Sequence, residues 1–144
     1  MIPESQWKWF GMAGHFICAA YCRHHLCTQI GNYLVSTVGQ YIPPSEVRGG
    51  VGADQWLREN WPGHDIGCNR KFETMVFAIE GYCHDPDCGC EQPLIVPSEV
   101  LSEGYSTIKE ANEGHVAMCR RVANGEAELH GLIEGTLDDV GGTP

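Results

Sequence analysis

Hydrophobic and polar residues follow a strand-like pattern most clearly over residues 71–79. Phe72 and Thr74 fall on one face of an extended chain there, and Met75 and Phe77 fall on the other. The later half of this stretch is apolar on both faces, as in a strand that is covered on each side. The pattern predicts a central strand over 71–79.

Residues 24–41 form two β-prone runs that are separated by Gly31-Asn32, a pair typical of a two-residue hairpin turn. The predicted cross-strand pairs are Ile30 with Tyr33, Thr28 with Val35, Leu26 with Thr37, Cys27 with Ser36 and His25 with Val38. A competing interpretation is a helix from about His15 to Gln29, broken at Gly31. We favour the hairpin.

Apolar residues recur at helical spacing between about Tyr105 and Ala123, after an extended stretch that contains Pro93 and Pro97. The predicted apolar stripe of this helix is Ile108, Ala111, His115, Met118, Cys119 and Val122.

Together these elements predict an α+β fold: a small antiparallel sheet with one or two helices and loops braced by metal-binding Cys and His residues. The 144 residues suffice for one domain with its own core. We therefore expect a single domain over 1–144, with a flexible segment at about 43–53 and a loose tail at about 136–144.

The net charge of −10 argues against sequence-independent binding to nucleic acid, which depends on Lys and Arg. The first residues lack a basic start with an apolar run, and no stretch of about 18 apolar residues occurs, so we expect no signal peptide and no membrane span. These features favour a cytoplasmic protein, in which disulfides are rare. Its eight cysteines then indicate metal ligands and small buried residues.

Three cysteines lie within eight residues, at Cys83, Cys88 and Cys90, directly after the predicted central strand. Because a closed tetrahedral zinc site needs four ligands, the remainder must come from other segments. His115 and Cys119 are one helical turn apart and can share a metal. We predict a site of Cys88, Cys90, His115 and Cys119, in which Cys83 can replace one ligand.

A second cluster begins with His15, Cys18 and Cys22, whose spacings of three and four suit one face of a helix or a metal-binding turn. One of His24, His25 or Cys27 would complete this site. Alternatively, the N-terminal and central cysteines share one ion. Thiolates favour zinc or an iron–sulfur cluster, and the histidines favour zinc.

Signatures of several enzyme classes are missing from the sequence, among them the zinc deaminase, His-Glu-x-x-His, phosphate-loop and Gly-x-Ser-x-Gly patterns. An open catalytic zinc site with Glu73 or Asp65 as the base is a less favoured alternative. Cys68 lies near Arg70 and Lys71, which lower a thiol pKa, but a structural thiol is the simpler interpretation.

Several motifs resemble those of a small phage and prophage protein family, a resemblance that covers most of the chain and brings no activity with it. The motifs are Trp7–Gly11, Gly14–Cys18, Cys22-Arg23, Tyr33–Tyr41, Arg70–Phe77, Cys88-Gly89-Cys90, and Gly114-His115 with Met118-Cys119. Met12 and Gln40 stand where the family has histidine and glutamate, and the segment between Tyr41 and Ile66 is shorter. These departures weigh against catalysis.

The resemblance implies a phage-type accessory protein in the cytoplasm of a bacterial host. The expected function is binding of a host or phage protein by a zinc-stabilised domain, with counteraction of a bacterial defence system as one role. A metal-dependent hydrolase or nucleotide-processing enzyme, and a virion or assembly component, are the alternatives.

Overall fold

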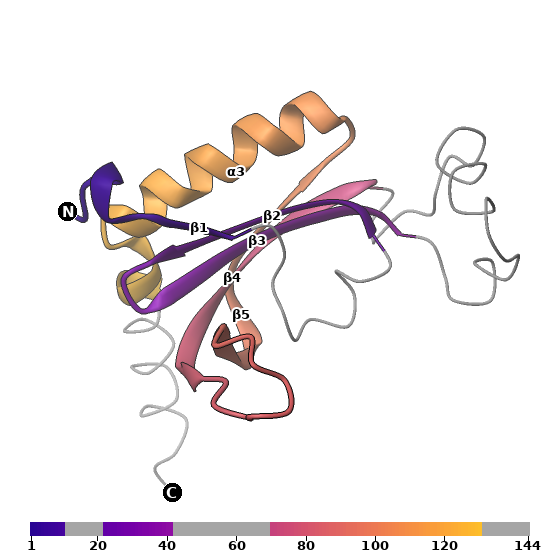
Figure 1. Ribbon diagram of the computed structural model, residues 1–144. Coiled ribbons are helices and arrows are strands. Elements are labelled where there is room, and N and C mark those ends of the chain that lie inside the picture. The colour runs from indigo at the N-terminus through magenta and orange to yellow at the C-terminus, as the bar shows by residue number, and fades with distance from the viewer. Residues whose placement is uncertain (11–21, 42–69, 131–144) are drawn as a thin grey trace, which may run out of the picture.

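The computed structural model describes residues 1–10, 22–41 and 70–130, which form a five-stranded antiparallel sheet with a long helix across one face (Figure 1). The strands lie side by side in chain order, β1-β2-β3-β4-β5. The elements are η1 (Glu4–Gln6), β1 (Lys8–Phe10), β2 (Cys22–Ile30), β3 (Tyr33–Tyr41), β4 (Phe72–Tyr82), β5 (Pro93–Tyr105) and α3 (Ile108–Ala123), and residues 126–130 are also helical. This arrangement confirms the predicted α+β class.

The hairpin of β2 and β3 has the predicted register. Ile30 pairs with Tyr33, and Thr28 pairs with Val35. Gly31 has a φ of +58°, the left-handed conformation that this turn demands and that glycine adopts readily. The competing helix over this segment is therefore wrong for residues 22–29.

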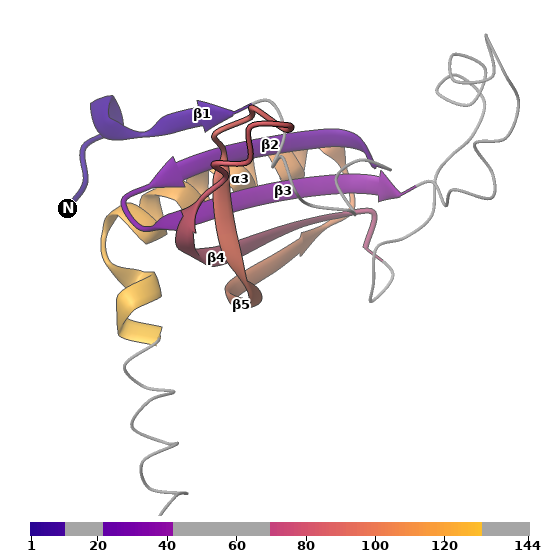
Figure 2. The same cartoon turned by 60° about the horizontal axis from the view of Figure 1, so that its bottom comes forward.

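Strand β4 is the predicted central strand, and it continues three residues beyond the predicted end at Ile79. Val76 and Phe77 are both buried, so both faces of the strand are covered. The register of β4 with β5 shifts at three places between Val76 and Gly81. Such bulges bend a strand and increase its twist, and the end of the β4–β5 hairpin curls away from α3 (Figures 1 and 2).

Helix α3 begins after Thr107, whose side-chain oxygen accepts a hydrogen bond of 3.1 Å from the backbone N–H of Glu110. The sequence predicted a helix start at about Tyr105, three residues before the observed start at Ile108. The buried face consists of Ala111, His115, Met118, Cys119, Val122 and Ala123. Ile108, the remaining member of the predicted stripe, is half-exposed in the first turn.

The main core lies between α3 and the sheet, where Ile30, Val35 and Val76 meet Met118 and Val122. Trp7 packs into the same core. A smaller apolar cluster on the other face contains Cys27 and Leu34, with Phe10, Ile79 and Ile95 packed against it. The sheet is thus a layer with apolar packing on both sides.

No helix in the three described ranges has the length and apolarity needed to cross a bilayer. The expected flexible segment at 43–53 and the loose tail at 136–144 lie outside the described residues.

Gly39 lies opposite Phe72 in the β3–β4 ladder, and a Cβ atom at Gly39 would overlap the buried Phe72 ring. Gly39→Ala is therefore expected to lower the free energy of unfolding by about 1–3 kcal/mol, the usual cost of overpacking. Gly81→Ala is the matched control, since its new Cβ would meet nothing within 4 Å. Urea unfolding of both variants tests this, and equal stability of the two would contradict it.

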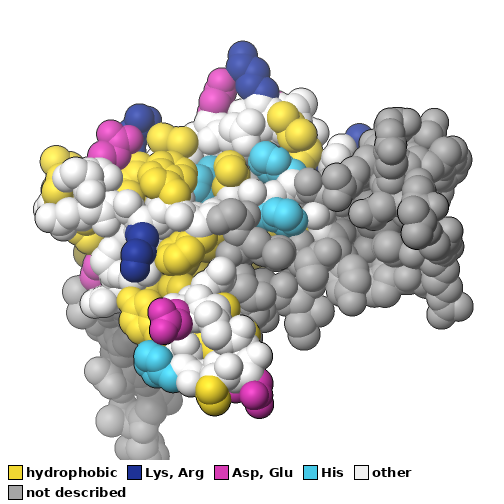
Figure 3. All heavy atoms as spheres, viewed as in Figure 1, with side chains coloured by type: hydrophobic (Ala, Val, Ile, Leu, Met, Phe, Trp, Pro, Cys, Tyr) yellow, Lys and Arg dark blue, Asp and Glu magenta, His cyan; other side chains and the backbone are white. Residues whose placement is uncertain are grey.

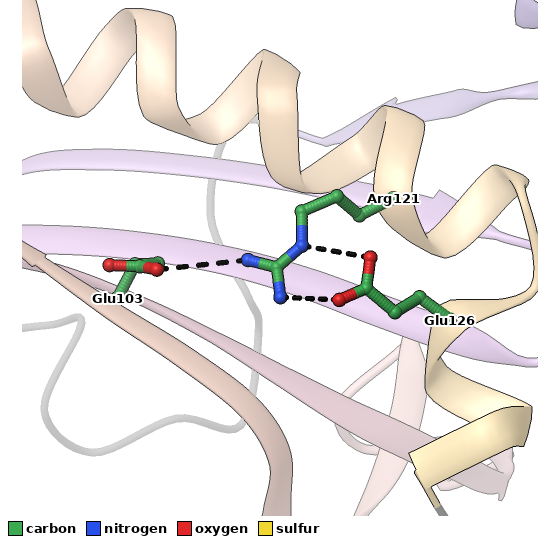
Figure 4. A network of polar contacts seen from close by, with 3 residues as sticks. All are labelled: Glu103, Arg121 and Glu126. Carbon is green, nitrogen blue, oxygen red and sulfur yellow. Dashed lines mark hydrogen bonds and ion pairs between the residues drawn. The ribbon is translucent and has the colours of Figure 1, made fainter.

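Arg121 fastens the last turn of α3 to the residues that follow it (Figure 4). Its Nε donates to Glu126 Oε2 over 3.0 Å and its Nη2 donates to Glu126 Oε1 over 2.6 Å. A third contact joins Arg121 Nη1 to Glu103 Oε1 of β5 at 3.8 Å. The hydrogen bond from Arg121 holds the pKa of the Glu126 carboxyl below its usual value.

Arg121→Ala is expected to lower the free energy of unfolding by only about 0.5–1 kcal/mol, because the ion pairs are partly solvated. Lys109→Ala, which removes a more exposed pair with Glu113, should change stability still less. Thermal unfolding measures both effects. A larger loss for Lys109→Ala than for Arg121→Ala would be inconsistent with this ranking.

Candidate metal centre

Three cysteine sulfur atoms converge in the loop between β4 and β5. The Sγ atoms of Cys83, Cys88 and Cys90 all lie within 4.8 Å of one another. Cys83 is buried at the end of β4, Cys90 is half-buried and Cys88 is exposed. The loop therefore presents three sulfur donors with a buried side and a solvent side.

The backbone of this loop accounts for the convergence. The Asp85 carbonyl accepts hydrogen bonds from the N–H groups of Cys88 and Gly89, at 3.2 and 2.9 Å, and Asp85 Oδ1 accepts one from the N–H of Asp87 at 2.9 Å. Gly89 has a φ of +68°, which favours glycine between two cysteines. A 2.9 Å bond from the N–H of Cys83 to the Gln92 carbonyl closes the loop.

The bent hairpin places this loop on the face of the sheet opposite α3, where Figure 2 shows it in front of β2 with the helix behind. Gln29 Nε2 donates a 2.7 Å hydrogen bond to the Tyr82 hydroxyl, which connects β2 to the residue before Cys83. The apolar cluster around Cys27 and Leu34 lies on this face. The loop is thus held by the sheet rather than standing alone.

The three thiols affect one another's ionisation. The backbone N–H of Asp85 lowers the pKa of Cys83, but burial and the hydrogen bonds with Cys90 and Cys88 together outweigh it, so the pKa of Cys83 is raised. Neighbouring thiolates repel one another, and several of them ionise together only beside a cation. A bound metal ion supplies that positive charge.

The spacing of the sulfur atoms suits a metal ion. Three thiolates at about 2.3 Å from a tetrahedral zinc ion lie roughly 3.8 Å apart, within the observed limit. No disulfide joins any two of the six cysteines in the described part of the chain. Cys83, Cys88 and Cys90 can therefore hold a metal ion.

His115 and Cys119 lie elsewhere, which differs from the predicted grouping with Cys88 and Cys90. His115 is fully buried beneath α3, with Nε2 2.8 Å from Thr28 Oγ1 and Nδ1 2.7 Å from Thr37 Oγ1. Both ring nitrogens are thus occupied by hydroxyl groups. Because α3 covers one face of the sheet and the loop lies on the other, the structure does not bring these residues together (Figure 1).

Cys119 packs in the core beneath α3, and Cys27 packs in the cluster on the opposite face. Burial, the largest cause in each case, raises the pKa of both thiols to about 12. They remain protonated at neutral pH and serve as small apolar core residues. Cys22 is buried at the start of β2.

The other predicted members of the N-terminal cluster, His15 and Cys18, lie outside the described residues, as do Cys68 and Asp65. Glu73 lies within the described residues and is half-buried. Burial raises the pKa of its carboxyl, and the nearby charge of Glu99 raises it further. Among the described residues, the cysteine loop alone forms a group with metal-binding geometry, and Glu73 is not part of it.

A polar network in the main core was missed by the sequence analysis. Thr37 and Thr74 hydroxyls lie 2.5 Å apart, and Thr37 also contacts His115, which in turn contacts Thr28. The Trp9 ring lies 5.9 Å from the imidazole, centroid to centroid. The available signal was the set of threonines on one face of the predicted strands, since a buried histidine needs hydroxyl or carbonyl partners.

Comparison with protein-family models, curated proteins and solved structures found no match for this chain.

Proposed function

We propose that Cys83, Cys88 and Cys90 bind one zinc ion that fixes the β4–β5 loop, and that the protein acts by binding another protein. The observation that carries this proposal is the convergence of three sulfur atoms within 4.8 Å. Soft thiolate ligands favour zinc, Cu(I) or iron–sulfur clusters. Three cysteines fall short of the four that iron–sulfur clusters commonly use, whereas zinc also binds three protein ligands with a fourth donor from outside the chain, and this supports zinc.

Exposed apolar side chains on the two edge strands of the sheet support a binding role. Trp9 on the edge strand β1 is 55% exposed, and Val96 on the opposite edge strand β5 is 39% exposed. Edge strands present unpaired backbone groups that another chain can pair with. Figure 3 shows hydrophobic side chains on the described surface near β1.

The sequence resemblance to phage proteins suggests the setting for this role. In the cytoplasm of a bacterial host, a small acidic protein of net charge −10 would select a basic protein surface. A host protein, including a component of a defence system, or a phage protein is the partner that we propose.

A metal-dependent hydrolase is the second candidate, because three protein ligands are also the usual number at a catalytic zinc. Three thiolates donate more negative charge than three imidazoles, and this charge raises the pKa of a zinc-bound water. Such a site is a weaker source of hydroxide at neutral pH. The ligand set thus favours a structural ion.

Elemental analysis of protein purified without added metal tests the proposal. We expect one zinc per chain, lost in Cys83→Ser and Cys88→Ser and retained in Cys119→Ala, whose thiol lies beneath α3. A second zinc that persists in Cys83→Ser would identify the predicted site around His15, Cys18 and Cys22. Metal-free wild-type protein with titratable thiols would refute the proposal.

A further inference from the structure

The cysteine loop offers three ligands to an ion that takes four. We infer that the metal bound by Cys83, Cys88 and Cys90 keeps its fourth coordination position on the solvent side of the loop, and that this position accepts an imidazole group from a second molecule. The inference rests on the proposed metal site and adds the chemistry of its missing ligand.

The other polar groups of the loop do not complete the site. Asp85 uses its carbonyl and one carboxylate oxygen for the turn that gathers the cysteines. His84, Asp87 and Glu91 are exposed, and none of them joins the group of mutually close donor atoms in the described residues. The loop is therefore built to present three sulfur donors.

Burial shows on which side the fourth position lies. Cys83 is only 6% exposed and forms the floor of the site, and Cys90 is half-buried, whereas Cys88 is exposed. Burial thus increases from Cys88 through Cys90 to Cys83, the residue that directly follows β4. A fourth donor approaches from the exposed side, which a second molecule can reach.

Charge favours a neutral donor over a further anion at this site. Three thiolates and one divalent ion sum to a net charge of −1, and the loop itself carries the exposed residues Asp85, Asp87 and Glu91. A fourth thiolate or a carboxylate would add an anion to an already anionic site. A neutral imidazole avoids this repulsion and is a common zinc ligand.

Cobalt substitution tests the inference on the full-length protein. Co(II) is added to the metal-free protein under anaerobic conditions, and imidazole is then titrated in. A near-ultraviolet thiolate-to-cobalt absorption reports binding by the cysteines, and the visible d–d bands report the fourth ligand. We expect the d–d bands to shift saturably with imidazole while the thiolate absorption is retained, and Cys88→Ser to lose that absorption.

The outcomes separate the two proposals. Absence of the thiolate absorption would overturn both the metal site and its fourth ligand. A thiolate absorption with d–d bands that imidazole does not change would overturn this inference alone. The inference is also overturned if a monomeric protein shows the imidazole-type bands before any imidazole is added, and if His84→Gln or His15→Gln removes these bands. The chain would then supply its own fourth donor.

Mass measurement distinguishes the sources of the imidazole. A metal-dependent doubling of mass that His84→Gln abolishes identifies a second copy of this chain as the donor and supports the inference. A monomer whose bands respond to imidazole and to acetyl-histidine amide, but not to acetyl-lysine amide, supports a different molecule as the donor.

Discussion

Replacement of His115 by alanine is expected to lower the free energy of unfolding by about 3–5 kcal/mol. The substitution leaves a cavity in the core beneath α3, as large-to-small core changes do. It also removes one hydrogen bond from Thr28 Oγ1 and one from Thr37 Oγ1, both fully buried, although Thr37 keeps its contact with Thr74 Oγ1. Each lost hydrogen bond adds about 0.5–1.5 kcal/mol to the cost.

Urea unfolding of His115→Ala measures this loss, with Glu113→Ala as the control from the exposed face of the same helix. His115→Phe separates the two causes, because it refills much of the volume but removes the imidazole as a hydrogen-bond partner of both hydroxyls, so an intermediate loss is expected. Wild-type stability in His115→Ala would show that the network contributes nothing.

The same residue makes stability depend on pH. Burial, and second the charge of His24, lower the pKa of His115 from 6.5 to about 4. Between these values the unfolded chain binds a proton that the folded protein does not, so stability falls as pH decreases from about 6.5 towards 4. The loss approaches roughly 3 kcal/mol, and His115→Phe should remove this contribution from the pH profile.

Removal of the proposed zinc ion by a chelator is expected to lower the free energy of unfolding by about 4 kcal/mol, relative to protein in free zinc at a thousandfold excess over Kd. The ion binds only when the folded loop brings the three sulfur atoms together, so binding energy becomes folding energy. For a domain of this size the midpoint of thermal unfolding should fall by roughly 10 °C.

Thermal unfolding with zinc and with EDTA measures this effect. The matched control is a variant with serine at Cys83, Cys88 and Cys90, whose unfolding midpoint should be the same under both conditions. A wild-type midpoint that EDTA leaves unchanged, in protein shown to contain zinc, would mean that the ion does not stabilise the fold.

Strands β2, β3 and β4 and the hairpin register could be predicted from sequence because their signals are local, whereas β1 and β5 were not predicted as strands. Gly31-Asn32 sets the turn, and alternation over 71–79 identifies a strand covered on both sides. The cysteine cluster was also visible, since Cys88 and Cys90 are two residues apart and Cys83 precedes them on the same loop.

The predicted grouping of His115 with Cys88 and Cys90 was wrong, because helical spacing shows which residues share a face but not which side of a sheet the helix covers. The bulges that carry the loop to the opposite side have no clear sequence signal either. In the sequence, a buried histidine that hydrogen-bonds to two threonines looks the same as a metal ligand. Only the arrangement of the strands distinguishes the two.

The two hydroxyls that hold His115 come from adjacent strands, Thr28 from β2 and Thr37 from β3. A slip of either strand by one residue would turn its threonine to the other face of the sheet. Only a correctly paired hairpin can then accept the imidazole when α3 docks. His115 thus disfavours incorrect strand pairing, since a sheet with the wrong register would leave its imidazole buried without these hydrogen-bond partners.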